Sequence, residues 1–135
     1  MKRISFPFDK NMIPANGIYV LFEKGETAHT VDRIVRIGTH TGENQLCSRL
    51  NQHFAIENKD RSIFRKNIGR ALLNKNNDSF LGQWEVDLTT KEAKNKHTID
   101  FIRQEAIEKE VTKYIHEYFS FVVFKVSVKL TASSA

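Results

Sequence analysis

The chain has 135 residues and a formal charge of +5, a size that suits one domain with a real core. Its apolar content of 40% excludes a disordered chain, and it contains no run of about 20 apolar residues that would span a membrane. The single Cys47 excludes an internal disulfide and is typical of a reducing cytosol. We therefore expect one cytoplasmic domain over 1–135, with no membrane contact, whose basic charge favours a polyanionic partner.

Two apolar runs near the N-terminus predict a hairpin of β-strands. They are Gly17 to Phe22 and Arg33 to Gly38, and the polar stretch between them fits an antiparallel connection. Tyr19 stands on the first run close to a glycine, so its hydroxyl could face a ligand without crowding. A loop then leads to helices expected over about 44–54 and 61–74, separated by a second loop at 55–60.

A third strand is predicted in the middle of the chain, where Trp84, Val86 and Leu88 alternate with acidic residues. The charged stretch 89–97 predicts a short exposed helix, and a long helix is expected from 98 or 99 to 119. Alternation from Phe124 to Leu130 predicts a closing strand, before a frayed tail at 131–135. The order of these elements predicts an α+β fold with an antiparallel sheet of about three strands flanked by helices.

The first predicted helix carries two polar residues beside its apolar stripe. Arg49 and His53 lie four residues apart along one margin of the stripe formed by Leu46, Leu50 and Phe54. Arginine suits a phosphate because its planar fork donates two parallel hydrogen bonds and stays charged. The alternative interpretation is a surface arginine with an ordinary solvated histidine.

The second predicted helix is basic. Arg61, Arg65, Lys66 and Arg70 all fall on it, with Lys75 at its end. A surface of this kind would supply the part of nucleic-acid affinity that does not depend on base sequence. The alternative is a solvated helix face with no ligand.

In the long helix, a glutamate falls among apolar residues. Steps of 100° per residue place Glu108 in the stripe formed by Phe101, Val111 and Ile115, whereas Glu110 faces the other way. A glutamate that faces the core is costly unless it is paired or binds a metal. A structural ion pair with Arg49 or another arginine is the alternative, as is a helix curved enough for Glu108 to reach water.

These residues together resemble the GIY-YIG nuclease superfamily over about 16–126. The tripeptide Gly17-Ile18-Tyr19 matches its first motif, and Arg36-Ile37-Gly38 is similar to the second with Arg36 in place of tyrosine, as in one bacterial branch. Arg49 matches the family's essential arginine, and Glu108 its metal-binding glutamate. The family's late asparagine has no counterpart here, since that region reads Phe119-Ser120-Phe121-Val122-Val123-Phe124.

The resemblance implies an endonuclease that hydrolyses DNA, with RNA also open, using one Mg²⁺ or Mn²⁺ ion. Glu108 would hold the metal, Arg49 would neutralise charge on the phosphate, and Tyr19 would orient or deprotonate the attacking water. His53 would hold Tyr19 or contact the phosphate, with His40 as a second candidate. From their positive charge, we expect the basic residues Arg36, Arg61, Arg65, Lys66 and Arg70 to contact the nucleic acid.

Two other functions are compatible with the sequence. The first is a non-catalytic nucleic-acid-binding module on the same fold, which the missing tyrosine and asparagine favour. The second is a small interaction domain with no nucleic-acid role, which would leave the polar set around Tyr19 to chance.

Overall fold

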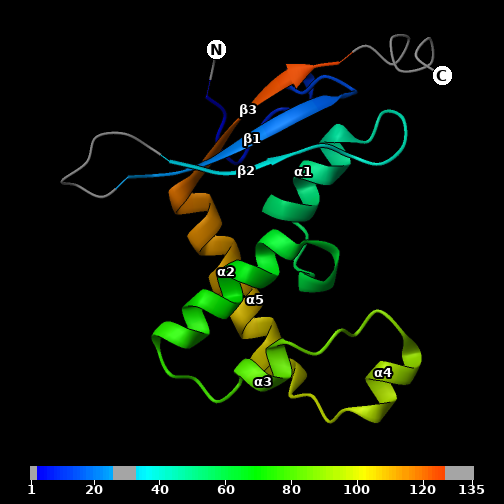
Figure 1. Cartoon of the computed structure of the whole chain (residues 1–135), viewed down its shortest axis with the longest axis vertical. Helices are drawn as coiled ribbons and strands as arrows, with labels where there is room; N and C mark the ends of the chain where they lie inside the picture. The colour runs from blue at the N-terminus through cyan, green and yellow to red at the C-terminus, as the bar shows by residue number, and fades with distance from the viewer. Residues whose placement is uncertain (1–2, 26–32, 127–135) are drawn as a thin grey trace. The chain divides into compact units, whose positions relative to one another are not determined.

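The computed structural model describes residues 3–25 and 33–126 (Figure 1). The chain divides into two compact units, the first formed by 1–54 and 115–135 and the second by 55–114. The prediction of a single domain over 1–135 stays a prediction. The predicted frayed tail at 131–135 lies outside the described residues.

The first unit contains an antiparallel sheet in the order β2-β1-β3. Its strands are β1 (Gly17–Glu23), β2 (Arg33–Gly38) and β3 (Phe119–Lys125). The predicted hairpin strands and the predicted α+β class are confirmed. The closing strand was predicted too late in the chain, because β3 begins directly after the long helix at Phe119 and not at Phe124.

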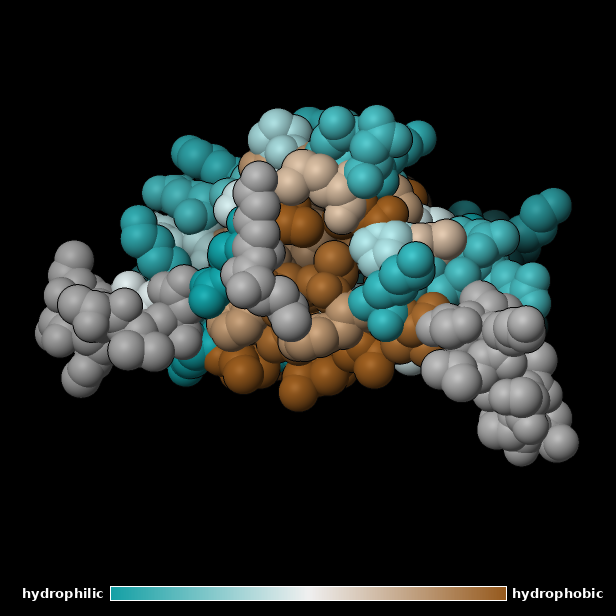
Figure 2. All heavy atoms as spheres, turned by 90° about the horizontal axis from the view of Figure 1, so that it is seen from above, coloured by the Kyte–Doolittle hydropathy of each residue, from teal (hydrophilic) through white to brown (hydrophobic). Residues whose placement is uncertain are grey.

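One face of this sheet is fully buried, and the other is only partly covered. Tyr19 and Leu21 of β1 are fully buried, whereas the alternate residue Ile18 is exposed. On β2, Ile34 and Ile37 are 58% and 67% exposed. The pairing of β1 with β2 shifts register between Leu21 and Phe22, where β2 contains one extra residue. Figure 2 shows apolar side chains gathered in the middle of the face that it draws.

The helix α1 (Leu46–Phe54) follows the sheet hairpin in the same unit. It begins two residues later than predicted, since Asn44 has a positive φ of 60° that no helix accommodates. Its buried residues include Leu50 and Phe54, and Phe54 packs against Phe121 of β3 with ring centroids 5.3 Å apart. The short 3₁₀ helix η1 (Lys10–Met12) precedes the sheet.

The second unit is helical. It contains η2 (Lys59–Arg61), α2 (Ile63–Lys75), α3 (Leu81–Trp84) and α4 (Lys91–Lys96), and α5 (Phe101–Tyr118) begins in it. The exposed helix predicted at 89–97 corresponds to α4. Within the part of the chain that is described, no helix is both long and apolar enough to cross a membrane.

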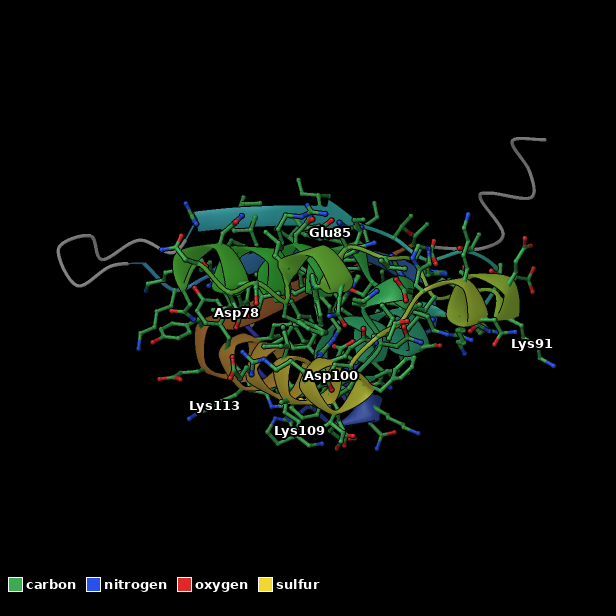
Figure 3. All side chains as sticks on the ribbon, turned by 90° about the horizontal axis from the view of Figure 1, so that it is seen from below. Asp78, Glu85, Lys91, Asp100, Lys109 and Lys113 are labelled. Atoms are coloured by element: carbon green, nitrogen blue, oxygen red, sulfur yellow. The ribbon has the colours of Figure 1, made fainter. Side chains whose placement is uncertain are left out.

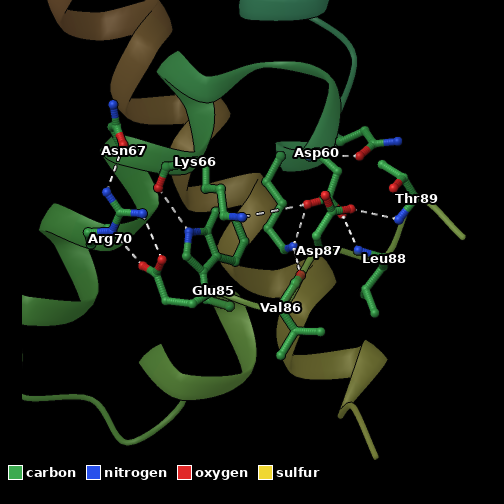
Figure 4. Close-up of polar contacts among 12 residues, drawn as sticks. Asp60, Lys66, Asn67, Arg70, Glu85, Val86, Asp87, Leu88 and Thr89 are labelled. Atoms are coloured by element: carbon green, nitrogen blue, oxygen red, sulfur yellow. Dashed lines mark hydrogen bonds and ion pairs between the residues drawn. The ribbon is translucent and has the colours of Figure 1, made fainter. Parts of the chain in front are cut away.

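The strand predicted at Trp84, Val86 and Leu88 is wrong. Trp84 ends α3, and the backbone that follows is held by side chains of η2 (Figure 4). Lys59 Nζ donates to Val86 O at 2.6 Å, and Leu88 N donates to Asp60 Oδ2 at 3.1 Å. Because these side chains satisfy the backbone groups, the segment needs no neighbouring strand.

Helical phasing was correct for the middle of α5 and wrong at its start. Glu108, Val111 and Ile115 are all buried, as the 100° steps predicted. Phe101 was placed in the same stripe but is 53% exposed, at the first residue of the helix.

Candidate active site

Tyr19 and His53 form the centre of the candidate site. Tyr19 lies on the buried face of β1, and His53 lies in the last turn of α1. The Tyr19 hydroxyl oxygen and His53 Nε2 are 2.7 Å apart, and both residues are 0% exposed. The rings meet edge to face with centroids 5.5 Å apart, so the pair is fixed by packing as well as by its hydrogen bond.

Gly38 leaves the space that the Tyr19 ring occupies. The two residues are direct partners across β1 and β2. A Cβ at Gly38 would lie 2.4 Å from the Tyr19 hydroxyl oxygen, far inside contact distance. The glycine that leaves room for the Tyr19 ring is therefore Gly38, the last residue of Arg36-Ile37-Gly38. Gly17 has a different role, because it lets β1 approach the Phe124 carbonyl of β3 closely.

Arg36 also contacts the Tyr19 hydroxyl. Its side chain is half-buried, and its Nε lies 3.4 Å from the Tyr19 oxygen, a long hydrogen bond. Because arginine only donates, the Tyr19 oxygen accepts from Arg36 and its own proton can point to His53 Nε2. This assignment places the proton of a neutral His53 on Nδ1. His53 is then poised to accept the Tyr19 proton.

His40 has both ring nitrogens bonded to backbone groups. Its Nε2 accepts from the Gly17 N–H at 3.1 Å, so Nδ1 carries the proton donated to Gly42 O at 2.9 Å. Thr39 Oγ1 donates to the Gly17 carbonyl at 2.9 Å. Both side chains therefore extend the hydrogen bonding of β1 beyond the end of β2, and His40 is held there by structural bonds.

Arg49 lies one turn before His53 on α1. It is half-buried, and its Nη1 donates to Gln52 Oε1 at 2.6 Å. Arg36 and Arg49 therefore bring two partly exposed cationic side chains to the unit that contains Tyr19.

Glu108 belongs to the second unit and is paired with an arginine there. Its Oε1 accepts from Arg65 Nη2 at 3.0 Å, and its Oε2 accepts from the Lys59 N–H at 2.6 Å. The residue is 3% exposed. Burial raises the pKa of the Glu108 carboxyl, while the Arg65 guanidinium and the Lys59 N–H act in the opposite direction.

This environment does not fit the expected metal ligand. Both carboxylate oxygens of Glu108 accept hydrogen bonds, and a cation there would lie beside the positive Arg65 guanidinium. Mg²⁺ prefers six oxygen ligands and keeps several waters, which a site this closed does not admit. Across residues 3–25 and 33–126, no group of three or more His, Cys, Asp or Glu side chains could hold a metal ion.

The basic residues of α2 differ in their surroundings. Arg65 was predicted to bind nucleic acid, but it is 0% exposed because it pairs with Glu108, so that prediction is wrong. Arg70 forms a two-bond pair with Glu85, and Lys66 Nζ lies 3.9 Å from Asp60 (Figure 4). Arg61 is exposed. Other exposed cations of the second unit, which sequence reasoning left out, include Lys91, Lys109 and Lys113 (Figure 3).

A family comparison identifies the fold. The sequence pattern of the GIY-YIG domain matches residues 5–135. The chain belongs to the GIY-YIG family. Searches of curated proteins and of solved structures found no match to it. Members of this family are generally nucleases, so this chain carries a nuclease-type domain.

The GIY-YIG assignment accounts for one part of the predicted site directly. Tyr19 of the first tripeptide contacts both His53 and Arg36, which stands where the family's second tyrosine is expected. Sequence reasoning missed the role of Gly38, although its place in the second tripeptide was a usable signal. An ion pair of Glu108 with an arginine was one of the alternatives from the sequence, and the structure shows that pair with Arg65, whereas the Lys59 N–H as a second partner was missed.

Proposed function

We propose that this protein is an endonuclease that hydrolyses phosphodiester bonds of DNA, with Tyr19 and His53 as its proton-transfer pair. The observation that supports this most is the 2.7 Å contact between the Tyr19 hydroxyl and His53 Nε2, together with Arg36 on the same oxygen. A pair of titratable groups within hydrogen-bond reach is the arrangement that general base catalysis needs. Membership of a nuclease family supports the substrate class.

The phosphate would first meet the two half-buried arginines. Arg36 and Arg49 would each donate to non-bridging oxygens, where charge develops in the transition state. As Arg36 turns toward the phosphate, it uncovers the Tyr19 hydroxyl, which is otherwise fully buried. Water could then reach that hydroxyl.

The proton moves along the Tyr19–His53 contact. Tyr19 takes a proton from the attacking water while its own proton passes to His53 Nε2. The new bond joins the water oxygen to phosphorus, and the bond to the leaving oxygen breaks. That oxygen takes a proton from solvent. Exposed basic residues such as Arg61 would add affinity that does not depend on base sequence.

The family resemblance also predicts one Mg²⁺ or Mn²⁺ ion, and this stays a prediction. No step above passes through a metal, because Glu108 does not fit as its ligand. Cleavage assays with Mg²⁺, with Mn²⁺ and with EDTA would determine whether an ion takes part.

The test is cleavage of supercoiled plasmid by purified wild type and by Tyr19→Phe, with Tyr118→Phe as the matched control. Tyr118 is an exposed tyrosine at the end of α5, so its variant reports the effect of losing a hydroxyl elsewhere. Loss of an acid–base group typically costs about 10²–10⁴-fold in rate. We expect Tyr19→Phe to lose cleavage on that scale and to bind the plasmid as wild type does, whereas Tyr118→Phe cleaves normally. Normal cleavage by Tyr19→Phe would contradict the proposed role.

A non-catalytic nucleic-acid-binding module is the second candidate. The complete burial of Tyr19 and His53 favours it, because neither side chain reaches solvent while Arg36 covers the hydroxyl. This function predicts that wild-type protein binds DNA or RNA with a dissociation constant of roughly 10⁻⁶ to 10⁻⁴ M at physiological salt and cuts neither under any metal condition.

A further inference from the structure

Glu108 holds together three elements of the second unit. Its Oε2 accepts from the backbone N–H of Lys59 in η2, and its Oε1 accepts from Arg65 of α2, at 2.6 and 3.0 Å. Arg65 Nη2 also donates to the Glu108 carbonyl at 3.0 Å and to Thr112 Oγ1 at 2.7 Å. One carboxylate on α5 therefore ties η2 and α2 to that helix.

The pair is closed off from water. Arg65 and Lys59 are 0% and 1% exposed, and Glu108 is 3% exposed. Buried neighbours on both helices include Phe64 of α2 and Val111 of α5. A buried charge that loses its partner is strongly unfavourable, because it keeps its desolvation cost without the compensating attraction. The two side chains therefore depend on each other.

A divalent cation would have to break these bonds. It would displace the Arg65 guanidinium, leave that charge buried and unpaired, and strip the Lys59 N–H of its acceptor. Thr112, which accepts from Arg65, donates its own hydroxyl to Glu57 at 2.9 Å, so the Glu57 carboxylate also has a hydrogen-bond partner. The donor set around Glu108 is that of an anion-binding site, and it opposes a cation.

We infer that Glu108 is a structural anchor of the second unit in this chain and does not serve as the ligand of a divalent metal ion. The inference departs from the role that the family resemblance implies for this residue. It does not depend on the proposed nuclease activity, since folding and metal binding are measured without a substrate.

The test is a double-mutant cycle read by thermal unfolding. The variants are Glu108→Gln, Arg65→Gln and the two combined, with Glu110→Gln as the control, because Glu110 is an exposed glutamate on the same helix. Each single change should lower the unfolding temperature by roughly 10 °C, since it leaves one buried charge unpaired. The unfolding temperature of the combined variant should fall by clearly less than the sum of the two single decreases. That of Glu110→Gln should fall by about 2 °C at most.

Titration with Mn²⁺ supplies the second measurement, with and without a short DNA duplex. We expect the combined variant and Glu110→Gln to bind Mn²⁺ as wild type does, or none of the three to bind it. If Glu108→Gln unfolds at the same temperature as wild type, and the decreases in unfolding temperature of the two single variants simply add in the combined variant, the anchor role is wrong. If the combined variant folds but binds Mn²⁺ more than 10-fold more weakly than Glu110→Gln, Glu108 is a metal ligand after all. A failure of wild type to cut plasmid would count against the nuclease proposal alone.

Discussion

Gly38→Ala should disturb the candidate site without removing any polar group from it. The added Cβ would lie 2.4 Å from the Tyr19 hydroxyl oxygen and 2.6 Å from Tyr19 Cζ. Ordinary contact begins near 3.4 Å, so the ring or β2 must move by about 1 Å. Gly38 is not among the described residues with a positive φ, so its backbone accepts alanine and the effect comes from the side chain alone.

The size of the effect follows from the packing. The Tyr19 ring is fully buried and bonded to His53, so it has little room to retreat. Overpacking of this kind typically costs about 1–3 kcal/mol, which should lower the unfolding temperature by several degrees. A shift of about 1 Å at a reacting group can cost on the order of 10²-fold in rate. We therefore expect Gly38→Ala to be modestly less stable than wild type and to cleave plasmid far more slowly.

Gly82→Ala is the matched control. A Cβ at Gly82, in α3, meets nothing within 4 Å, and alanine favours a helix over glycine, so stability should stay equal or rise slightly. The imidazole NMR signals of His53 provide a readout that needs no activity, and they should shift in Gly38→Ala only. Wild-type melting together with unchanged His53 signals in Gly38→Ala would refute the placement of the Tyr19 ring against β2.

Two further predictions concern the second unit. Gly69→Ala would place a Cβ 2.2 Å from Trp84 Cζ2 across α2 and α3, so thermal unfolding should show a loss of about 1–3 kcal/mol, and unchanged melting would mean that the indole does not lie there. The hydrogen bond from Arg70 lowers the pKa of the Glu85 carboxyl below its model-compound value of 4.5, so the pair stabilises the fold above that value and its contribution disappears as the pH falls through the folded pKa. The difference in melting temperature between wild type and Glu85→Gln should therefore shrink on acidification from about pH 6 to 3, and a constant difference would contradict the pairing.

Local patterns predicted the elements that hold Tyr19 and His53. Two apolar runs bounded by polar residues predicted both hairpin strands, because a short apolar run between polar segments is typical of a strand. The four-residue spacing of Leu46, Leu50 and Phe54 in α1 placed His53 at the margin of a buried stripe, and packing then enclosed His53 fully. Helical phasing likewise showed that Glu108 faces inward, since an α-helix fixes the direction of each side chain.

The same local patterns failed where side chains distant in sequence replace backbone partners. Trp84, Val86 and Leu88 alternate like a strand, yet Lys59 and Asp60 bond the backbone of this segment and remove its need for one. Arg65 looked like one more cation on a basic helix, and its burial follows from a glutamate more than forty residues away. A pattern read over a few neighbouring residues cannot reveal these partners, because they lie far away in the sequence.

By itself, the sequence determined the family, the two hairpin strands, the inward direction of Glu108 and the place of His53 beside a buried stripe, since residue types at a readable spacing mark each of these. Only the tertiary structure decided what those side chains meet. Tyr19 contacts His53 because Gly38 leaves room for the Tyr19 ring. Glu108 pairs with Arg65 because a buried carboxylate is stabilised most by a charged donor. Periodicity fixes which way a side chain points, but the partner that it finds depends on how separate elements pack.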